Sequence, residues 1–559
     1  MIALVVIATI LILLLGYRIY GRFLARQLAL DDANPTPACQ MNDGVDYVPA
    51  KPGLLLGQHF SAIAAAGPIV GPILAGMWFG WFPALLWIVL GAIFIGGVHD
   101  FGSLVASIRH KAASIGEVVR QHMSPTSHAL FLIFVWLALV YVIIAFTDIT
   151  AQTFKTVTEQ TAFGPGVAAS SMLYILAAML LGILLYKFKL RTSTGTLIFL
   201  PVVLFIIWIG PRLPQPMLGA LGDITAKQWD VVILFYCFLA SVIPMWLLLQ
   251  PRGYLGGWLL YLVIAAGLIG ALFGGFPVQY PAFNTTGLES LVNGKLIFPI
   301  LFITVACGAC SGFHSIVSSG TTSKQLAKES DARRVGYGAM LLEALVAVLA
   351  LATVMMLPRN SAMLKSDPNL IYAHGIARYL GLVGIDFSLA FAFALLAFST
   401  FVYDTLDVCT RLGRYVFQEI FGLKGVTGSI VATTATLLLP LFFLMSTQEK
   451  AYLVAWPIFG TSNQLLAGLT LLAISVWLVK TGRKAIYAIL PMIFMLIMTL
   501  WSLILLIRPF IRILPVWIAG AEVKTDMIIS GAFAVVLLVL SLWLIFETRT
   551  IFLPGRNKS

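Results

Sequence analysis

Long apolar runs constrain this chain more than any other feature of its sequence. Most are about 20 residues long, the length that an α-helix needs to cross the hydrocarbon core of a bilayer. The chain has 559 residues, of which 60% are hydrophobic and only 10% are charged, so we predict an all-α polytopic membrane protein. The predicted membrane helices, about fifteen in number, cover residues 2–20, 60–79, 83–108, 128–150, 167–186, 193–210, 231–249, 255–274, 296–318, 336–357, 386–405, 427–446, 456–479, 485–507 and 526–547.

Positive charges alternate with these runs. Lys and Arg gather in every second loop, as cytoplasmic loops do, although Arg508 and Arg512 depart from the pattern. The net charge of +12 is scattered over short loops, which argues against a nucleic-acid surface. We predict a retained first helix, an outside N-terminus and an inside C-terminus. The inner side then holds Arg18, Arg22, Arg26, Arg109, Lys111, Arg120, Lys187, Lys189, Arg191, Arg252, Lys324, Lys328, Arg333, Arg334, Arg411, Arg414, Lys424, Lys480, Arg483, Lys484, Arg549, Arg556 and Lys558.

One apolar run carries two glycine-proline pairs, Gly67-Pro68 and Gly71-Pro72. Each proline removes a backbone donor, so the helix is expected to break near mid-membrane. Unpaired backbone at that depth is tolerated where it is buried in protein or lines a polar cavity. A simple packing kink is the alternative. Because broken helices mark transporter binding sites, we predict that these four residues contribute to a substrate site.

Another predicted span, 231–249, also contains a proline, Pro244. The first broken helix would start inside and this one outside, so units 60–210 and 231–405 would have opposite orientations. Paired broken helices of this kind indicate a transporter core. The repeat rests on hydropathy and proline placement alone, without residue identity between the halves. We assign the remainder to a peripheral first helix (1–30), a cytoplasmic connector (31–59) and peripheral C-terminal helices (427–559).

Small and hydroxyl residues dominate the segment from Cys307 to Thr321. Ser311 and Ser315, together with Ser241 near Pro244, are candidates for hydrogen bonds to a substrate. Close helix packing is the alternative for these serines. The two cysteines of this segment, Cys307 and Cys310, lack a second ligand pair with metal-site spacing, so we interpret them as packing residues.

Ionisable residues inside apolar runs are costly and usually face a cavity. Histidine titrates near neutral pH and can carry a coupled proton. For His59 the alternative is a solvated position at the interface. For Asp404 and Asp407 the alternative to a functional role is a salt bridge with Arg411 or Arg414. A metal cluster of His99, Asp100, Asp404 and Cys409 has no support from local spacing, so we predict no metal or other cofactor. The proton-coupling candidates are His59, His99, Asp100, His314 and Asp404.

A set of ordered blocks covers residues 42–49, 57–60, 66–72, 99–101, 246–252, 311–314, 318–321 and 456–467. These blocks resemble the carbon starvation protein A family. The resemblance implies the amino acid–polyamine–organocation superfamily and a leucine-transporter-like 5+5 inverted repeat. It also implies uptake of pyruvate with protons, and of peptides during nutrient limitation. Gln58 stands where many relatives have a second histidine, which puts a coupling role at that position in doubt here.

We therefore expect a secondary transporter of the bacterial inner membrane, not an enzyme, that takes up a small carboxylate or a peptide with protons. Exposed half-helix ends would hold the carboxylate without a buried lysine. Sodium coupling through the hydroxyls of Ser315–Thr322, a metal-dependent membrane enzyme or sensor, and a passive channel remain open alternatives. The expected partners are the substrate and the bilayer, without nucleic acid. The sequence does not predict an oligomeric state.

Overall fold

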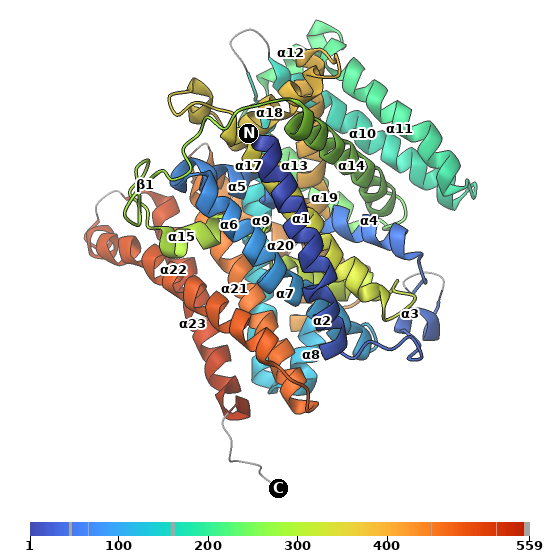
Figure 1. Ribbon diagram of the computed structural model, residues 1–559, viewed down its shortest axis with the longest axis vertical. Helices are drawn as coiled ribbons and strands as arrows, with labels where there is room; N and C mark the ends of the chain where they lie inside the picture. Colours follow the sequence, from blue (N-terminus) through green and yellow to red (C-terminus); the bar gives the residue numbers. More distant parts are fainter. Residues whose placement is uncertain (44–46, 65, 158–161, 449, 521–522, 553–559) are drawn as a thin grey trace.

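The computed structural model is a bundle of helices and describes residues 1–43, 47–64, 66–157, 162–448, 450–520 and 523–552 (Figure 1). Gly44, Val45, Asp46 and Ala65, which belong to segments singled out above, lie outside this part. Among the described residues, 12 helices are long and apolar enough to cross a membrane, or up to 14 if each of two bent helix pairs forms one span. The prediction of an all-α multi-pass membrane protein is confirmed.

The first half of the chain contains most of the predicted spans. Proline occupies the first turn of α4, α5 and α9, where its missing N–H breaks no helical bond. The elements are α1 (Ile2–Arg18), α2 (Tyr20–Gln27), α3 (Pro37–Gln40), α4 (Pro52–Ile63), α5 (Gly67–Phe79), α6 (Trp81–Gly91), η1 (Ala92–Gly96), α7 (Gly97–Arg109), α8 (Ile115–His122), α9 (Pro125–Phe154), α10 (Phe163–Tyr186), α11 (Thr192–Ile209), η2 (Gly210–Arg212), α12 (Gln215–Asp223), α13 (Ala226–Val242) and α14 (Leu249–Phe273).

The second half begins with a short antiparallel hairpin in which Thr285 pairs with Ser290. Its longest helix, α19, is capped at its N-terminus by Asp386. The Asp386 carboxylate accepts a hydrogen bond from the backbone N–H of Leu389. The elements are β1 (Thr285–Thr286), β2 (Glu289–Ser290), α15 (Ile297–Thr304), α16 (Phe313–Val317), η3 (Ser318–Thr322), η4 (Arg333–Tyr337), α17 (Gly338–Met355), η5 (Ala362–Lys365), α18 (Pro368–Gly381), α19 (Phe387–Phe421), α20 (Gly425–Ser446), α21 (Ala451–Lys480), α22 (Ile486–Ile518) and α23 (Thr525–Phe552).

Burial divides the spans into an inner and an outer group. The helices α9, α17, α19 and α21 are the most buried, whereas α1, α11, α22 and α23 are buried over less than half of their apolar stretch. In Figure 1, α10 and α11 lie on one flank of the molecule and α22 and α23 on the other. Helix α21 falls in the segment that we expected to be peripheral, yet it is 94% buried. The predicted domain boundaries otherwise remain predictions.

Three of the predicted spans are absent from the 12 continuous ones, namely 60–79, 231–249 and 296–318. Two of them contain a break, and the third runs past the end of a helix. The predicted span 60–79 is divided between α4 and α5, which are bent by 52°. The break precedes Gly67, so Gly67 and Pro68 form the first turn of α5 and Pro72 lies within that helix. We expected the helical hydrogen bonds to be interrupted between Gly67 and Pro72, but the interruption lies a few residues earlier. A proline in the first turn of a helix costs no hydrogen bond, so Pro68 does not break α5.

Pro244 does not interrupt a span. It lies in the turn between α13 and α14, and the preceding Ile243 is extended (φ −69°, ψ 155°), as proline requires of its neighbour. The predicted span 296–318 contains the other break. Helix α15 ends at Thr304, and α16 begins only at Phe313. The second broken helix of the chain is therefore α15–α16. The expectation that Pro244 breaks a second membrane helix is wrong.

Candidate functional site

The two breaks lie against each other at the centre of the bundle. A Cβ atom on Gly67 would come within 2.3 Å of Cys307 Sγ, and one on Gly71 within 2.4 Å of the Thr304 carbonyl oxygen. Gly71 is therefore required for the close approach of two backbones, and Gly67 leaves room for the side chain of Cys307. The glycines that accompany the prolines place α5 directly on the segment between α15 and α16.

The backbone of the second break is satisfied mainly by α21. Asn463 accepts hydrogen bonds from two backbone N–H groups, that of Gly312 to its carbonyl oxygen and that of Phe313 to its Oδ1 atom, both 3.0 Å long. Gln464 Nε2 donates to the carbonyl oxygen of Phe302 at 2.6 Å. Trp87 Nε1 donates to that of Val305 at 3.2 Å. Irregular backbone at membrane depth persists because neighbouring helices supply its missing partners.

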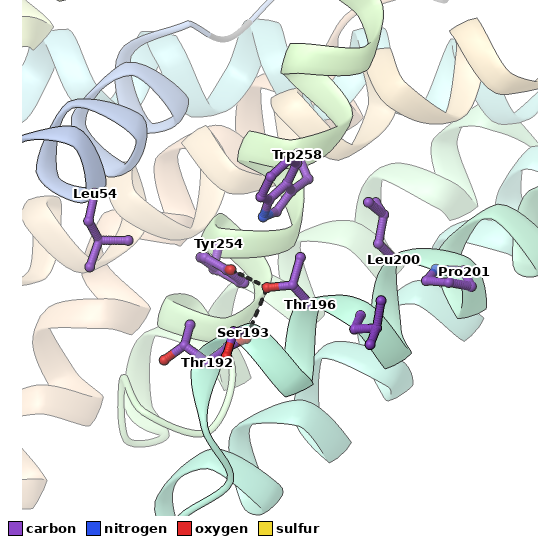
Figure 2. Close-up of a pocket in the computed structure, with 9 residues that line it drawn as sticks. Leu54, Thr192, Ser193, Thr196, Leu200, Pro201, Tyr254 and Trp258 are labelled. Carbon is purple, nitrogen blue, oxygen red and sulfur yellow. Dashed lines mark hydrogen bonds between the residues drawn. The ribbon is translucent and has the colours of Figure 1, made fainter.

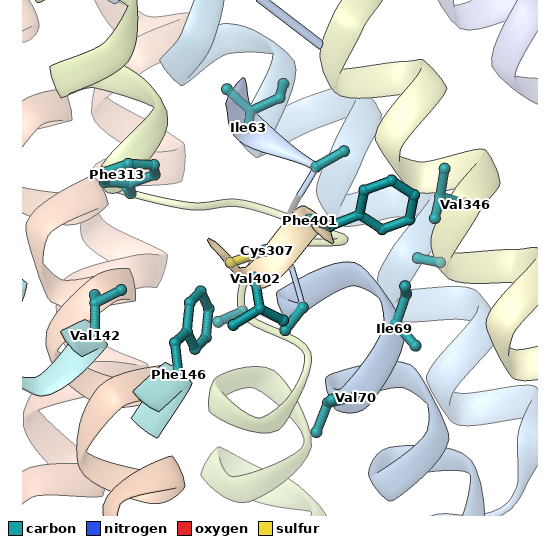
Figure 3. Packing of buried hydrophobic residues seen from close by; sticks show 14 of the residues in the cluster. Ile63, Ile69, Val70, Val142, Phe146, Cys307, Phe313, Val346, Phe401 and Val402 are labelled. Carbon is teal, nitrogen blue, oxygen red and sulfur yellow. The ribbon is translucent and has the colours of Figure 1, made fainter. Parts of the chain in front are cut away.

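Apolar side chains surround the breaks. Figure 3 shows Ile63, Ile69 and Cys307 of the broken segments together with Phe401 and Val402 of α19, all of them buried. Ser311 brings polarity to this region, because Asn463 Nδ2 donates to its Oγ atom at 3.0 Å. The surroundings of the breaks thus combine apolar walls with a few placed hydrogen-bonding groups, as small-molecule sites do.

A cluster of four ionisable side chains lies beside the second break. The Asp100 carboxylate stands between two imidazoles, with Oδ1 2.7 Å from His99 Nδ1 and Oδ2 2.8 Å from His314 Nδ1. The other ring nitrogen of His314 is 3.2 Å from Glu343 Oε2. All four side chains are fully buried. Buried charges must be compensated, so this closed group of two carboxylates and two imidazoles has to retain protons.

His59 and Ser315 extend this polar region. His59 is buried, so the solvated interfacial position considered for it is wrong, and its Nδ1 atom lies 2.9 Å from Thr322 Oγ1. Ser315 Oγ donates to the Gly312 carbonyl oxygen at 2.7 Å, and it lies 3.2 Å from Thr470 Oγ1. The predicted residues His59, His99, Asp100, His314, Ser311 and Ser315 are therefore gathered around the second break.

Asp404 belongs to a separate cluster. Its Oδ1 atom lies 3.5 Å from Arg252 Nε, and the Nη1 atom of the same arginine donates to Asp407 Oδ2 at 2.5 Å. Tyr236 donates to the same Asp407 oxygen at 2.8 Å. Asp407 thus forms a salt bridge, but with Arg252 and not with the expected Arg411 or Arg414. Arg252 itself is fully buried within α14, so its assignment to a cytoplasmic loop is wrong.

Ser241 and Pro244 lie apart from the two breaks. Arg414 Nη1 donates to the Ser241 carbonyl oxygen at 2.5 Å, and Arg411 Nη2 donates to those of Ala240 and Ile243. These arginines satisfy the terminal carbonyls of α13, which have no helical partner. The structure therefore separates Ser241 and Pro244 from the other substrate-binding candidates.

A pocket of about 320 Å³ lies at the end of α15, next to the second break. Its walls include Thr304, Trp456 and Lys295. The Lys295 ammonium lies 4.2 Å from the centre of the Trp78 ring, and burial lowers the pKa of Lys295. The indole nitrogen of Trp456 is buried and has no hydrogen-bond partner among the described residues. A lysine and an unpaired N–H donor thus line a cavity that ends at the break.

Sequence reasoning missed Asn463, Glu343 and Arg252 as site residues. Asn463 lies inside a long apolar helix, and a polar amide at that depth was the available signal. Glu343 was visible as a carboxylate in a span, but nothing in the sequence connects it with His314. No three His, Cys, Asp or Glu side chains in the described part of the chain are arranged to hold a metal ion.

The helices, the paired breaks and the buried ionisable clusters define an α-helical, multi-pass membrane protein with a polar centre. Comparison with known protein families shows to which family this membrane protein belongs. The family model described as "Carbon starvation protein CstA" matches residues 1–372 and 358–502. The chain belongs to the carbon starvation protein CstA family, as the sequence blocks indicated.

Curated relatives agree with this assignment. The peptide transporter CstA of Helicobacter pylori (strain J99) is 33% identical over 90% of this chain and 82% of its own length. The pyruvate/proton symporter BtsT of Escherichia coli K12 is 30% identical over 89% of this chain and 81% of its own length. These names are those of transporters, and they confirm the prediction of a transport protein instead of an enzyme.

Among solved structures, a manganese transporter of Eremococcus coleocola is similar, with 14% identity and a TM-score of 0.47. The alignment covers 91% of this chain and 99% of the transporter.

Proposed function

We propose that the protein is a proton-coupled secondary transporter of the bacterial inner membrane that takes up a small carboxylate such as pyruvate, or a peptide. The family relatives include proteins named for peptide transport and for pyruvate/proton symport. The observation that carries the proposal is the buried cluster of His99, Asp100, His314 and Glu343 at the second break. It joins a proton-holding group directly to an interrupted membrane helix.

The substrate is proposed to bind where the two breaks meet. Helix α5 has 13 residues and starts at Gly67, so its positive dipole end points at the break and favours a carboxylate. Ser311 and Asn463 offer polar groups on the other side. The surrounding apolar walls suit a methyl group or an apolar side chain. The pocket at Lys295 and Trp456 provides an approach to this site for an anion.

The proposed coupling uses the contacts of His314. In this structure its imidazole lies between Asp100 and Glu343, one carboxylate at each ring nitrogen. His314 is in α16, Asp100 in α7 and Glu343 in α17, so a shift of α16 changes both contacts. A change in proton occupancy of the cluster therefore changes the balance between arrangements of the broken helix, which is what coupling requires.

We retain the proposal that two parts of the chain have opposite orientations in the membrane. The second broken helix is now α15–α16 instead of the helix that ends near Pro244. Six spans lie between the α4–α5 break and the α15–α16 break when the bent pair α12–α13 counts as one. An even number of intervening spans gives the two broken helices opposite directions across the bilayer. The start of α1 and the end of α23 also lie toward opposite ends of the molecule, which supports placing the two termini on opposite sides of the bilayer (Figure 1).

Uptake into proteoliposomes tests the proposal. Labelled pyruvate and labelled dipeptides are supplied outside, with and without an inward proton gradient, and sodium is replaced by potassium in a parallel series. We expect accumulation of one substrate above its equilibrium level, loss of accumulation with a protonophore, and no effect of the sodium replacement. Accumulation that follows a sodium gradient, or mere equilibration in all conditions, would contradict the proposal.

A further inference from the structure

A groove of about 610 Å³ lies on the surface of the bundle where α4, α11 and α14 meet. Figure 2 shows Leu54, Leu200 and Trp258 around it, one from each helix, with Thr196 and Tyr254 hydrogen-bonded to each other. Helices α11 and α14 are apolar enough to span a membrane, and the large apolar side chains of Leu54, Leu197 and Trp258 in the groove are exposed. The groove therefore opens to the hydrocarbon region of the bilayer, with hydroxyl groups near one end.

That end of the groove carries positive charge. Lys187, Lys189 and Arg191 form the turn before Thr192 and Ser193, which line the groove, and all three are exposed. None of the three forms an ion pair with a carboxylate in the described part of the chain.

The turn has a fixed conformation. The backbone N–H of Lys187 donates to the Ile183 carbonyl oxygen at 2.9 Å, and that of Leu190 donates to Leu184 at 3.0 Å. A further cation, Lys51, stands at the start of α4, one turn before Leu54. The cations thus form a rim next to the groove, without a carboxylate counter-ion among the residues that the structure describes.

We propose that this groove binds an anionic phospholipid of the surrounding bilayer. Its acyl chain lies against Leu54, Leu200 and Trp258, and its charged headgroup is held by Lys187, Lys189 and Arg191. Charge complementarity selects the occupant, because basic clusters at the membrane surface attract anionic lipids while a zwitterionic headgroup brings no net charge.

The bound lipid contacts the half-helix that leads into the first break. Leu54 is on α4, and Ser61 Oγ on the same helix donates to the Gly253 carbonyl oxygen of α14 at 3.1 Å. Lipid in the groove thus packs against α4 on the side where α4 already meets α14. The lipid composition of the membrane is therefore expected to influence the position of α4.

Native mass spectrometry of the detergent-purified protein tests the proposal, with phosphatidylglycerol or phosphatidylcholine added at equal concentration. We expect at least a fivefold preference for phosphatidylglycerol. The triple variant Lys187→Gln/Lys189→Gln/Arg191→Gln should lose this preference. The matched control Lys424→Gln/Lys480→Gln/Lys484→Gln removes the same charge from other exposed positions and should keep it.

A second variant tests the groove itself. Leu200→Trp fills part of the cavity but leaves the cations in place, so it should reduce retention of phosphatidylglycerol while thermal unfolding stays unchanged. Soluble glycerol phosphate should not displace the lipid, because it lacks acyl chains. Equal retention of the two lipids by the unaltered protein, an equal loss in the control variant, or displacement by glycerol phosphate would each overturn the proposal.

Discussion

His314 is the residue on which the proposed coupling depends most directly. It is fully buried, and each of its ring nitrogens faces a carboxylate. We expect His314→Ala to reduce uptake driven by a pH gradient by at least about tenfold, because no other group in the cluster can occupy the position between Asp100 and Glu343. Exchange of substrate across the membrane without a gradient should decrease much less.

The control for this prediction is His374→Gln in α18, a histidine outside the cluster whose ring packs on Phe387. Both variants are compared by uptake in proteoliposomes at several imposed pH gradients. If His314→Ala folds normally and its uptake still depends on the proton gradient as in the unaltered protein, His314 does not carry the coupled proton.

Asp404 and Asp407 lie three residues apart and should differ in their effect on stability. Asp407 accepts hydrogen bonds from both Arg252 and Tyr236. In the described part of the chain, neither carboxylate oxygen of Asp404 has a hydrogen-bond partner. Removing one partner of a buried ion pair costs about 3–5 kcal/mol. We expect Asp407→Asn to lower the unfolding temperature markedly and Asp404→Asn to change it little, as measured by thermal unfolding in detergent. Equal shifts would mean that the two carboxylates share the arginine.

At the scale of the element, the contact between the two breaks depends on glycine. A Cβ atom at Gly71 would meet the Thr304 carbonyl oxygen at 2.4 Å, so α5 and α15 would have to move apart. Overpacking of this kind costs about 1–3 kcal/mol. We expect Gly71→Ala to lower both thermal stability and uptake, while Gly219→Ala, with no atom within 4 Å of the added Cβ, should leave both unchanged. Full activity of Gly71→Ala would show that the breaks need not touch.

The junction of α7 and α8 should respond to pH. His110 Nδ1 lies 2.6 Å from the Ala106 carbonyl oxygen and therefore carries the proton, so in neutral His110 the Nε2 atom accepts from His122 Nε2 at 2.7 Å. Burial, then the nearby charges of His110 and Lys480, lower the pKa of His122. The folded state thus prefers neutral His122. This contribution to stability is present above the ordinary pKa of about 6.5 and is lost as the pH falls through the lowered value.

Hydrogen exchange of the α8 amides measures this effect. We expect protection to decrease between pH 7.5 and pH 5.5, after correction for the intrinsic exchange rate, and His122→Gln to remove the dependence. The amides of α21, which stay buried beside this junction, supply the internal reference. Protection of α8 that is the same at both pH values would contradict the assignment.

The sequence predicted the elements better than it predicted their breaks. Apolar length located the continuous spans because bilayer thickness sets that length directly. Proline placement located the first break to within a few residues, but it pointed to Pro244 for the second, where the chain simply turns between two helices. The actual second break, from Val305 to Gly312, contains no proline. It is maintained by Asn463, Gln464 and Trp87, which are distant in sequence and pair with it only in the folded state.

Among the site residues, too, some could be predicted from the sequence and others could not. His99, Asp100 and His314 could be selected from sequence because a charge inside an apolar run is costly wherever it lies. Their partners could not be selected, since the contact between His314 and Glu343 depends on how α16 packs against α17. Arg252 was assigned to a loop for a related reason. Charge alternation cannot distinguish a cytoplasmic arginine from one that is neutralised inside the protein by Asp407.

At the scale of the whole molecule, the predicted orientation in the membrane has a direct test. Cys39 is the exposed cysteine of the described residues, so it is first replaced by serine. New cysteines are then introduced separately as Asn293→Cys in the loop before α15 and Lys187→Cys in the turn after α10, both exposed. Charge alternation puts residue 293 outside and residue 187 inside.

Intact cells are treated with a membrane-impermeant maleimide, and the same reagent is applied to permeabilised cells. We expect Asn293→Cys to react in intact cells, and Lys187→Cys to react only after permeabilisation. Three spans separate residue 187 from residue 293, namely α11, the bent pair α12–α13 and α14. A miscount among these three would reverse one label and not the other, whereas a miscount of α4–α5 would reverse both. Reaction of both positions in intact cells would therefore place the miscount between α11 and α15, where the span formed by α12 and α13 is bent by 96°.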